Sequence, residues 1–175
     1  MTIEEFISIA TESAEDYELV DGELIPFPSQ SPLHSHIRSL MSHILHGYFK
    51  ENSAGIAFAG IDWTLDSCNV RRVDVGVIIG VGKIQRIDWD KAPVPFAPDI
   101  AIEILSPNER AMDVRRRVRD YLRAGTAEVW LLDHANGEVH IWTASGNRVF
   151  QSSDSIESAL LPGFQPSVDA LVNNH

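Results

Sequence analysis

The amino-acid sequence predicts one mixed α/β domain over residues 1–175, a β-sheet of parallel and antiparallel strands flanked by helices. A helical pattern that ends at Gly125 stands between two apolar strand patterns, and this order indicates a parallel crossover. The pairs Asp21-Gly22 and Asn136-Gly137 each separate two apolar runs, which predicts antiparallel hairpins in the same sheet. A chain of 175 residues that is 44% hydrophobic is long enough to bury one core of its own.

The first half of the chain follows from local patterns. Apolar residues at helical spacing predict a short helix over residues 2–13, and the Asp21-Gly22 hairpin comes next. Ser31 can cap a helix whose first position is Pro32 and which runs to about Lys50. Two apolar runs then predict strands over residues 55–65 and 72–79.

The second half begins with a segment rich in Gly and Pro, residues 80–98, which we interpret as a loop. The other elements are read from apolar runs and from their turn residues. They are a strand over 99–105, a helix over 111–124, strands over 128–132, 139–143 and 149–151, and a short helix or coil within 160–172.

The charge and the apolar runs limit the classes of function. The net charge of -11 argues against broad nucleic-acid binding, because phosphate contacts need a basic face, although a local basic groove is still allowed. No apolar run approaches the roughly 18 residues that a membrane span needs, and no signal-peptide pattern opens the chain. With a single cysteine, Cys68, no disulfide forms within the chain, and we expect a cytoplasmic protein that does not bind membranes.

Two carboxylates point the same way from the strand at residues 99–105. Side chains alternate between the faces of a strand, so the isoleucines share one face while Asp99, Ala101 and Glu103 share the other. Asp74 is a further acid within an apolar strand, and Glu23 follows the tight turn of the first hairpin. A buried carboxylate is costly unless it is paired, protonated or bound to a metal.

Such a set of acids suits Mg²⁺ or Mn²⁺, which prefer oxygen ligands and activate water for attack on a phosphodiester. The alternative is that the acids form salt bridges with Arg71, Arg72 or the arginine-rich helix at 111–124. Asp74 and Glu103 together favour the metal, whereas Asp99 could simply pair at the start of its strand.

The order of these segments resembles a known family. The motifs that carry the resemblance are Tyr17-Glu18-Leu19-Val20-Asp21-Gly22-Glu23-Leu24, Ser31-Pro32-Leu33-His34, Arg71-Arg72-Val73-Asp74-Val75, Pro98-Asp99-Ile100-Ala101-Ile102-Glu103-Ile104-Leu105-Ser106-Pro107, Asp113-Val114-Arg115-Arg116-Arg117, Tyr121-Leu122-Arg123-Ala124-Gly125, Val129-Trp130-Leu131-Leu132-Asp133 and Leu161-Pro162-Gly163-Phe164. Together they resemble the Uma-type restriction endonucleases, a bacterial branch of the PD-(D/E)XK nuclease superfamily, over residues 15–170.

The resemblance implies a restriction-endonuclease-like fold and a metal-dependent endonuclease, with DNA expected ahead of RNA as the substrate. Asp74 and Glu103 would hold the ion with help from Asp99, and Glu23 would be a further catalytic acid.

The superfamily places a lysine two residues after the second acid, where this chain has Leu105. The resemblance implies a family lysine on the following helix at the position of Arg117. We therefore expect Arg117 to stabilise charge on the phosphate, with Arg115 in support. Arginine stays protonated and leaves the general base undefined. The alternative is therefore a catalytically inactive binding or regulatory protein on a nuclease fold. A homodimer is a further expectation.

Overall fold

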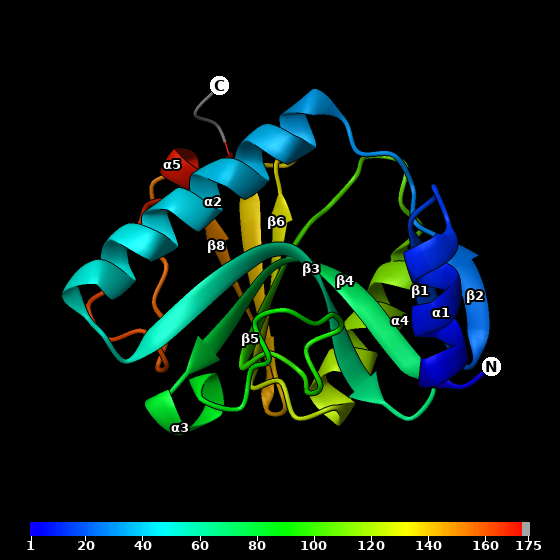
Figure 1. Cartoon of the computed structure of the whole chain (residues 1–175). Coiled ribbons are helices and arrows are strands. Elements are labelled where there is room, and N and C mark those ends of the chain that lie inside the picture. The colour runs from blue at the N-terminus through cyan, green and yellow to red at the C-terminus, as the bar shows by residue number, and fades with distance from the viewer. Residues whose placement is uncertain (173–175) are drawn as a thin grey trace.

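The computed structural model describes residues 1–172, and residues 173–175 of the predicted domain lie outside the described residues. In chain order the elements are α1 (Ile3–Glu12), β1 (Tyr17–Val20), β2 (Glu23–Pro26), α2 (Pro32–Glu51), β3 (Gly55–Asp66), β4 (Asn69–Ile79), α3 (Val81–Ile84), β5 (Ile100–Ile104), α4 (Ala111–Arg123), β6 (Glu128–Asp133), β7 (Glu138–Thr143), β8 (Gly146–Gln151) and α5 (Val168–Val172). Figure 1 labels most of them.

All the strands belong to one eight-stranded sheet, ordered β2-β1-β4-β5-β6-β7-β8, with β3 paired to β4. The β5–β6 pair is parallel and is joined through α4, while the other neighbours are antiparallel. The predicted mixed sheet, its parallel crossover and its hairpins are therefore confirmed.

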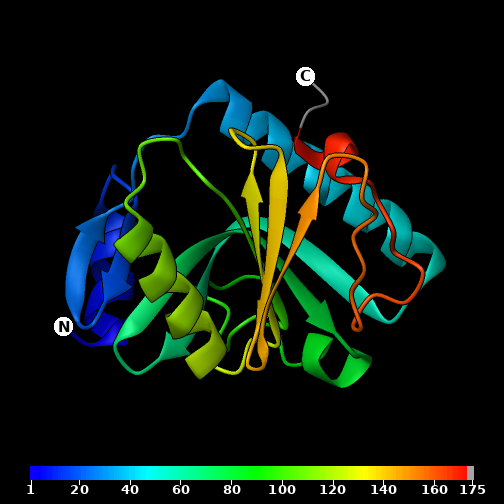
Figure 2. The same cartoon turned by 180° about the vertical axis from the view of Figure 1, so that it is seen from behind.

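Helices cover the two faces of the sheet unequally. On one face α2 and α5 pack over the isoleucines of β5 and the inward residues of β6 and β7. On the other face α4 lies against β5 and β6 (Figure 2). The side chain of Ser31 accepts a hydrogen bond from the His34 amide and Pro32 opens α2, as the sequence predicts.

Three elements differ from the sequence prediction in their bounds or in their type. β4 begins at Asn69, ahead of the predicted residue 72, because Arg71 and Arg72 form buried or half-buried ion pairs that periodicity does not reveal. β8 begins at Gly146, where the turn continues into pairing with Thr143. The predicted loop 80–98 contains the short helix α3.

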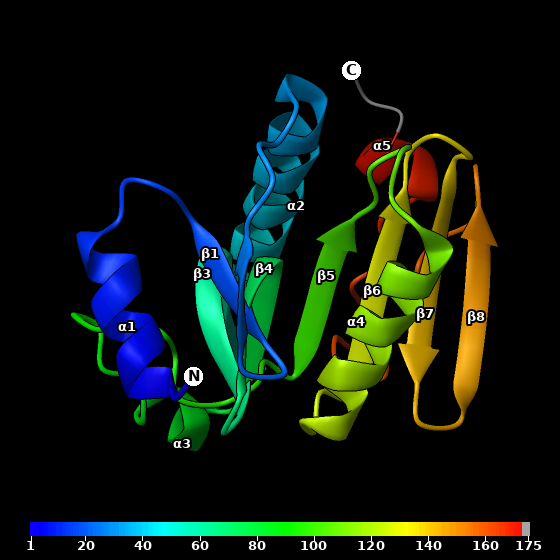
Figure 3. The ribbon, with the colours of Figure 1, turned by 90° about the vertical axis from the view of Figure 1, so that its right-hand side faces the viewer.

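Strand β4 has two different neighbours along one edge. Near its start, Val70 pairs with Leu19 of β1, and near its end, residues 75–77 pair with β5, while β3 occupies the other edge. We call the stretch between them, residues 71–74 of β4, the β1–β5 opening. Figure 3 shows β5 diverging from β4 toward the carboxyl end of β5. In the β1–β5 opening, backbone N–H and C=O groups are not paired with β1 or β5 on this edge, so side chains can bond to them.

Gly76 of β4 lies against the ring of the buried Trp63, and a Cβ atom there would overlap the indole. We predict that Gly76→Ala lowers the free energy of unfolding by about 1–3 kcal/mol, the usual cost of overpacking a core. Urea unfolding followed by circular dichroism measures it.

Gly47, in α2, has open space around its Cα, so Gly47→Ala is the matched control. It should raise the free energy of unfolding by about 0.5–1 kcal/mol through helix propensity. Equal effects of the two substitutions would contradict the packing of Trp63 on Gly76.

Candidate active site

Glu103 projects from β5 toward α4, as the alternation of that strand predicts, and it is almost completely buried. Two side chains of α4 meet its carboxylate. Arg117 Nη1 donates to Glu103 Oε2 at 3.1 Å, and the Tyr121 hydroxyl donates a short hydrogen bond to Glu103 Oε1. The spacing of four residues puts both donors on one side of the helix. Tyr121 is not among the site residues predicted from the sequence, and its only signal there is its place on the buried side of the helix.

Burial raises the pKa of Glu103 to about 7, because water no longer solvates the charged form. The positive charge of Arg117 and the hydrogen bond from Tyr121 act in the opposite direction. The negative charges of Asp74 and Glu18 raise the pKa further. Asp74 and Glu18 therefore both lie near enough to Glu103 for their charges to act on it.

Asp74 lies in the β1–β5 opening and is also buried. Its carboxylate accepts hydrogen bonds from the Ile104 amide at 2.9 Å, from His34 Nε2 at 2.7 Å and from Gln30 Nε2 at 3.0 Å. The β4–β5 pairing stops at Val75, so the Asp74 side chain satisfies a β5 amide just beyond the last pair. Asp74 thus connects β4 to the end of β5 that carries Glu103.

His34 is a further residue that contacts a site acid. It belongs to the Ser31-Pro32-Leu33-His34 motif of the family resemblance, and it is buried at the start of α2 against Asp74. It is the first member of the buried stripe of α2, which continues with Ile37, Met41 and Leu45. The helical spacing of these residues is the signal in the sequence that could have predicted the burial of His34.

Glu18, not Glu23, is the acid that β1 and β2 bring toward the site. Glu18 Oε1 accepts from the Arg72 amide at 3.0 Å, and Glu18 Oε2 accepts from Arg71 Nη1 at 3.0 Å. Glu23 is exposed on the edge strand β2. The sequence could not decide between the two acids, because only the sheet order shows that β1 is the strand beside β4.

Arg71 connects this acid to α4. Its Nη2 donates to Asp120 Oδ2 at 2.9 Å, while its Nη1 is held by Glu18. The guanidinium is buried, and these two charges fix it across the β1–β5 opening. The alternative that the site acids form salt bridges therefore holds for Glu103, which pairs with Arg117 of the arginine-rich helix. Arg71 and Arg72 pair with other acids, namely Glu18, Asp120, Asp16 and Asp62.

Asp99 belongs to a different part of the molecule. It accepts from Lys83 Nζ at 2.8 Å and from the Ile79 amide at 2.7 Å. It precedes Glu103 by four residues, roughly 13 Å along an extended strand. The structure therefore does not bring Asp99 to Asp74 and Glu103, and its role is the ion pair that the sequence offered as its alternative.

The arginines of α4 differ in their partners and in their distance from Glu103. Arg117 is paired with both Glu103 and Glu109, so it lies where the sequence expected a cation. Arg116 contacts Asp21 of the first hairpin. Arg115 is exposed on the other flank of α4 and makes no contact with Glu103 that would support the predicted assistance to Arg117.

The acids of the site bear on whether it can hold a divalent metal. Within residues 1–172, no group of three or more His, Cys, Asp and Glu side chains has a geometry suited to a metal ion. Mg²⁺ and Mn²⁺ need fewer protein ligands than zinc, because one or two carboxylates with waters and substrate phosphate complete their coordination. The raised pKa of Glu103, caused in part by Asp74, is relieved by a nearby cation. Asp74 and Glu103 are buried carboxylates, which is the ligand type that such an ion prefers, whereas Asp99 is paired with Lys83.

Comparisons with known proteins point to one family. The model of a family described as "Uma2: Putative restriction endonuclease" matches residues 3–171 of the chain. A crystal structure described as "a putative nuclease belonging to DUF820" from Anabaena variabilis has a TM-score of 0.85 and 24% identity, over 99% of this chain and 98% of that chain. At this identity the likeness establishes the restriction-endonuclease-like fold. No curated protein matches the chain. Among the described helices, none has the length and apolar character to cross a membrane.

The pKa of Glu103 predicts how stability depends on pH without divalent metal. The unfolded glutamate titrates near 4.5 and the folded one near 7, so the unfolded chain releases its proton first as pH rises. The free energy of unfolding of wild type, relative to Glu103→Gln, should fall between about pH 4.5 and 7 by on the order of 3 kcal/mol and then level off.

Urea unfolding of both proteins from pH 4.5 to 8 measures this difference, with Glu23→Gln as an exposed control that should follow wild type. Parallel curves for wild type and Glu103→Gln would show that folding does not raise the pKa of Glu103.

Proposed function

Because the chain belongs to the Uma2 family, whose model spans residues 3–171, we propose that it is a metal-dependent nuclease that hydrolyses phosphodiester bonds of DNA. The observation that carries the proposal is that Glu103 is buried beside the Arg117 guanidinium and within range of the charge of a second buried acid, Asp74. Opposite charges within one buried site are what a phosphodiester with a bound cation requires.

Asp74 and Glu103 are the residues that would hold Mg²⁺ or Mn²⁺. When bound, such an ion lowers the pKa of a coordinated water and neutralises charge on the phosphate. The protein already orients Asp74 from three sides, through Ile104, His34 and Gln30. In metalloproteins, residues that hydrogen-bond to a metal ligand commonly orient that ligand, and these three donors would orient Asp74 in the same way.

Arg117 is the group that would stabilise negative charge on the attacked phosphate. It stays protonated, so it supplies charge and hydrogen bonds but does not remove a proton from water. At present its guanidinium is shared between Glu103 and Glu109, and an incoming phosphate would take the place of Glu109. Burial keeps Tyr121 protonated, with its pKa raised well above the usual range, so its hydroxyl keeps donating to Glu103.

DNA is the proposed substrate because the family description names a restriction endonuclease, a class that acts on DNA. The net charge of -11 means that binding must depend on local positive charge and on the metal, not on a broadly basic surface.

The first test is cleavage of supercoiled plasmid with Mn²⁺ or Mg²⁺. We predict that wild type nicks the plasmid and that Asp74→Asn and Glu103→Gln each reduce the rate at least about a hundredfold, since each removes charge that holds the ion. Gel electrophoresis over time gives the rates, and calorimetry with Mn²⁺ should show one site in wild type that Asp74→Asn loses.

Glu23→Gln is the matched control, because Glu23 is an exposed acid in the same segment of the family resemblance. It should cleave as wild type does. Cleavage that survives in both site variants would come from a contaminant, and no Mn²⁺ binding by wild type would exclude the proposed metal site.

A non-catalytic nucleic-acid-binding protein on the same fold is the second candidate. The observation that favours it is that Arg117, not a lysine, is the cation beside Glu103, while Leu105 packs with the apolar core next to α4. Under this candidate the protein binds DNA but wild type does not cleave it.

Substitutions at Arg117 separate the two candidates. If the protein is a nuclease, Arg117→Lys should keep cleavage within about tenfold of wild type, since the charge stays in place, and Arg117→Met should lower kcat roughly a hundredfold. Single-turnover rates on a labelled duplex measure both, with melting temperatures to verify folding. Wild-type rates in Arg117→Met would exclude the proposed role of the guanidinium.

A further inference from the structure

One half of the sheet face that carries α4 has no helix over it. In Figure 2 α4 lies to one side, and β7 and β8 have no helix in front of them within the described part of the chain. Side chains that β7 and β8 direct to this face remain half-exposed or exposed, among them His140, Trp142 and Val149. The other face of the same strands is closed by the core under α2 and α5.

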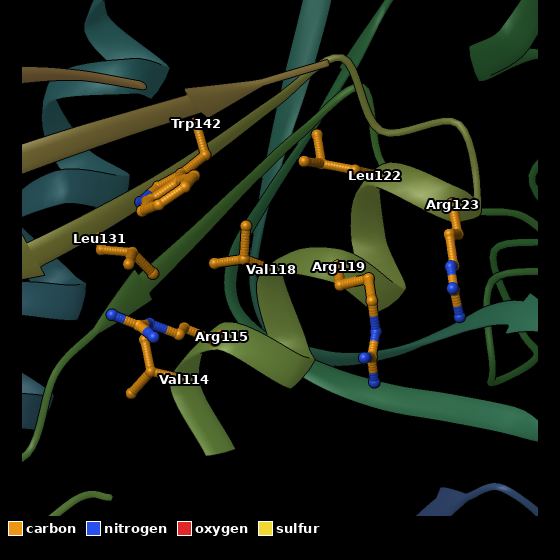
Figure 4. Close-up of a pocket in the computed structure, with 8 residues that line it drawn as sticks. All are labelled: Val114, Arg115, Val118, Arg119, Leu122, Arg123, Leu131 and Trp142. Carbon is orange, nitrogen blue, oxygen red and sulfur yellow. The ribbon is translucent and has the colours of Figure 1, made fainter. Parts of the chain in front are cut away.

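An apolar groove of about 480 Å³ follows the border between α4 and this bare face (Figure 4). Val114, Val118 and Leu122 form its helix side, and Leu131 and Trp142 form its sheet side. We call it the α4 groove. Its lining does not include Arg117, Asp120 or Tyr121, which contact Glu103 and Arg71, so it is separate from the candidate active site.

Three arginines border the α4 groove: Arg115, Arg119 and Arg123. They recur every four residues, so they follow one another at roughly 6 Å along one side of the helix. Among the described residues, Arg115 and Arg123 have no side-chain hydrogen bond or ion pair, and Arg119 has only a 3.9 Å contact with its neighbour Asp120.

The arginine row contrasts with the overall charge of the chain, which has 25 acidic and 14 basic residues. The arginines on the other side of α4 and on β4 are all compensated by carboxylates. An excess of acid elsewhere therefore leaves this row of guanidinium groups available to negative charge from another molecule.

We propose that the α4 groove docks an acidic amphipathic helix of a partner protein. Its apolar side would cover Val118, Leu122 and Trp142, and its carboxylates would pair with the arginine row. The bare strands β7 and β8 are about 4.8 Å apart, and a helix of about 10 Å diameter covers two such strands beside α4.

Two other occupants fit the surface less well. A twofold contact with a second copy would set the arginine row against itself, because such an interface matches one patch with the same patch. A nucleic-acid strand would need aromatic platforms for its bases, and four of the five apolar lining residues are aliphatic.

The test uses two synthetic helical peptides of equal length. In one, leucines at i, i+3, i+4 and i+7 are combined with glutamates, and in the other lysines replace the glutamates. Calorimetry with the full chain should show binding of the acidic peptide and none of the basic one. Arg119→Glu/Arg123→Glu should weaken the acidic peptide roughly tenfold or more and create binding of the basic peptide, because rim charges turn from attractive to repulsive.

Lys50→Glu/Lys91→Glu is the matched control, since it makes the same change in net charge away from the α4 groove. It should bind the acidic peptide as wild type does, and plasmid cleavage should be unchanged in both double variants.

Three results would overturn the proposal. The first is no preference of wild type for the acidic peptide. The second is a dimer in light scattering that Arg119→Glu/Arg123→Glu converts to monomer, which would assign the groove to a second copy. The third is binding of a labelled single-stranded oligodeoxynucleotide to wild type that is lost in Arg119→Glu/Arg123→Glu but kept in Lys50→Glu/Lys91→Glu, which would assign the groove to nucleic acid.

Discussion

The burial of the Glu103 carboxylate is the constraint on which the rest of the site depends. A charged group in a protein interior is tolerated only with partners, and here they come from one helix, α4, through Arg117 and Tyr121. This fixes both the rotation of α4 about its axis and its position along β5. Because desolvation is only partly offset, Glu103 keeps a raised pKa and an affinity for additional positive charge.

The opening in the sheet brings the other acids to Glu103. If β1 and β5 continued their pairing along β4, backbone groups would bond to each other and the side chains of Glu18 and Asp74 would have no place there. Instead Glu18 accepts from the Arg72 amide and Asp74 accepts from the Ile104 amide. Glu18 and Asp74 thus accept the backbone hydrogen bonds that the β1–β5 opening leaves unpaired, and this holds both acids near Glu103.

Helix α4 has two different polar flanks, although its sequence shows only a run of arginines. On the flank facing β1 and β4, Arg116 and Arg117 are neutralised by carboxylates, as the buried site requires. On the flank facing β7, Arg115, Arg119 and Arg123 border an apolar groove and keep their charge exposed. One helix can therefore serve the chemistry of the site on one side and contact with other molecules on the other.

The sequence by itself determined the order of the elements, the parallel crossover through α4, and the face of β5 that carries Glu103, because these depend on local periodicity and turn residues. It also identified Asp74 as an acid in need of partners. Only the tertiary structure decided that Glu18 and His34 are near these residues and that Glu23 and Asp99 are not. The physical reason is that alternation tells which face a side chain takes, whereas its neighbours depend on which strand lies beside it and where the pairing stops.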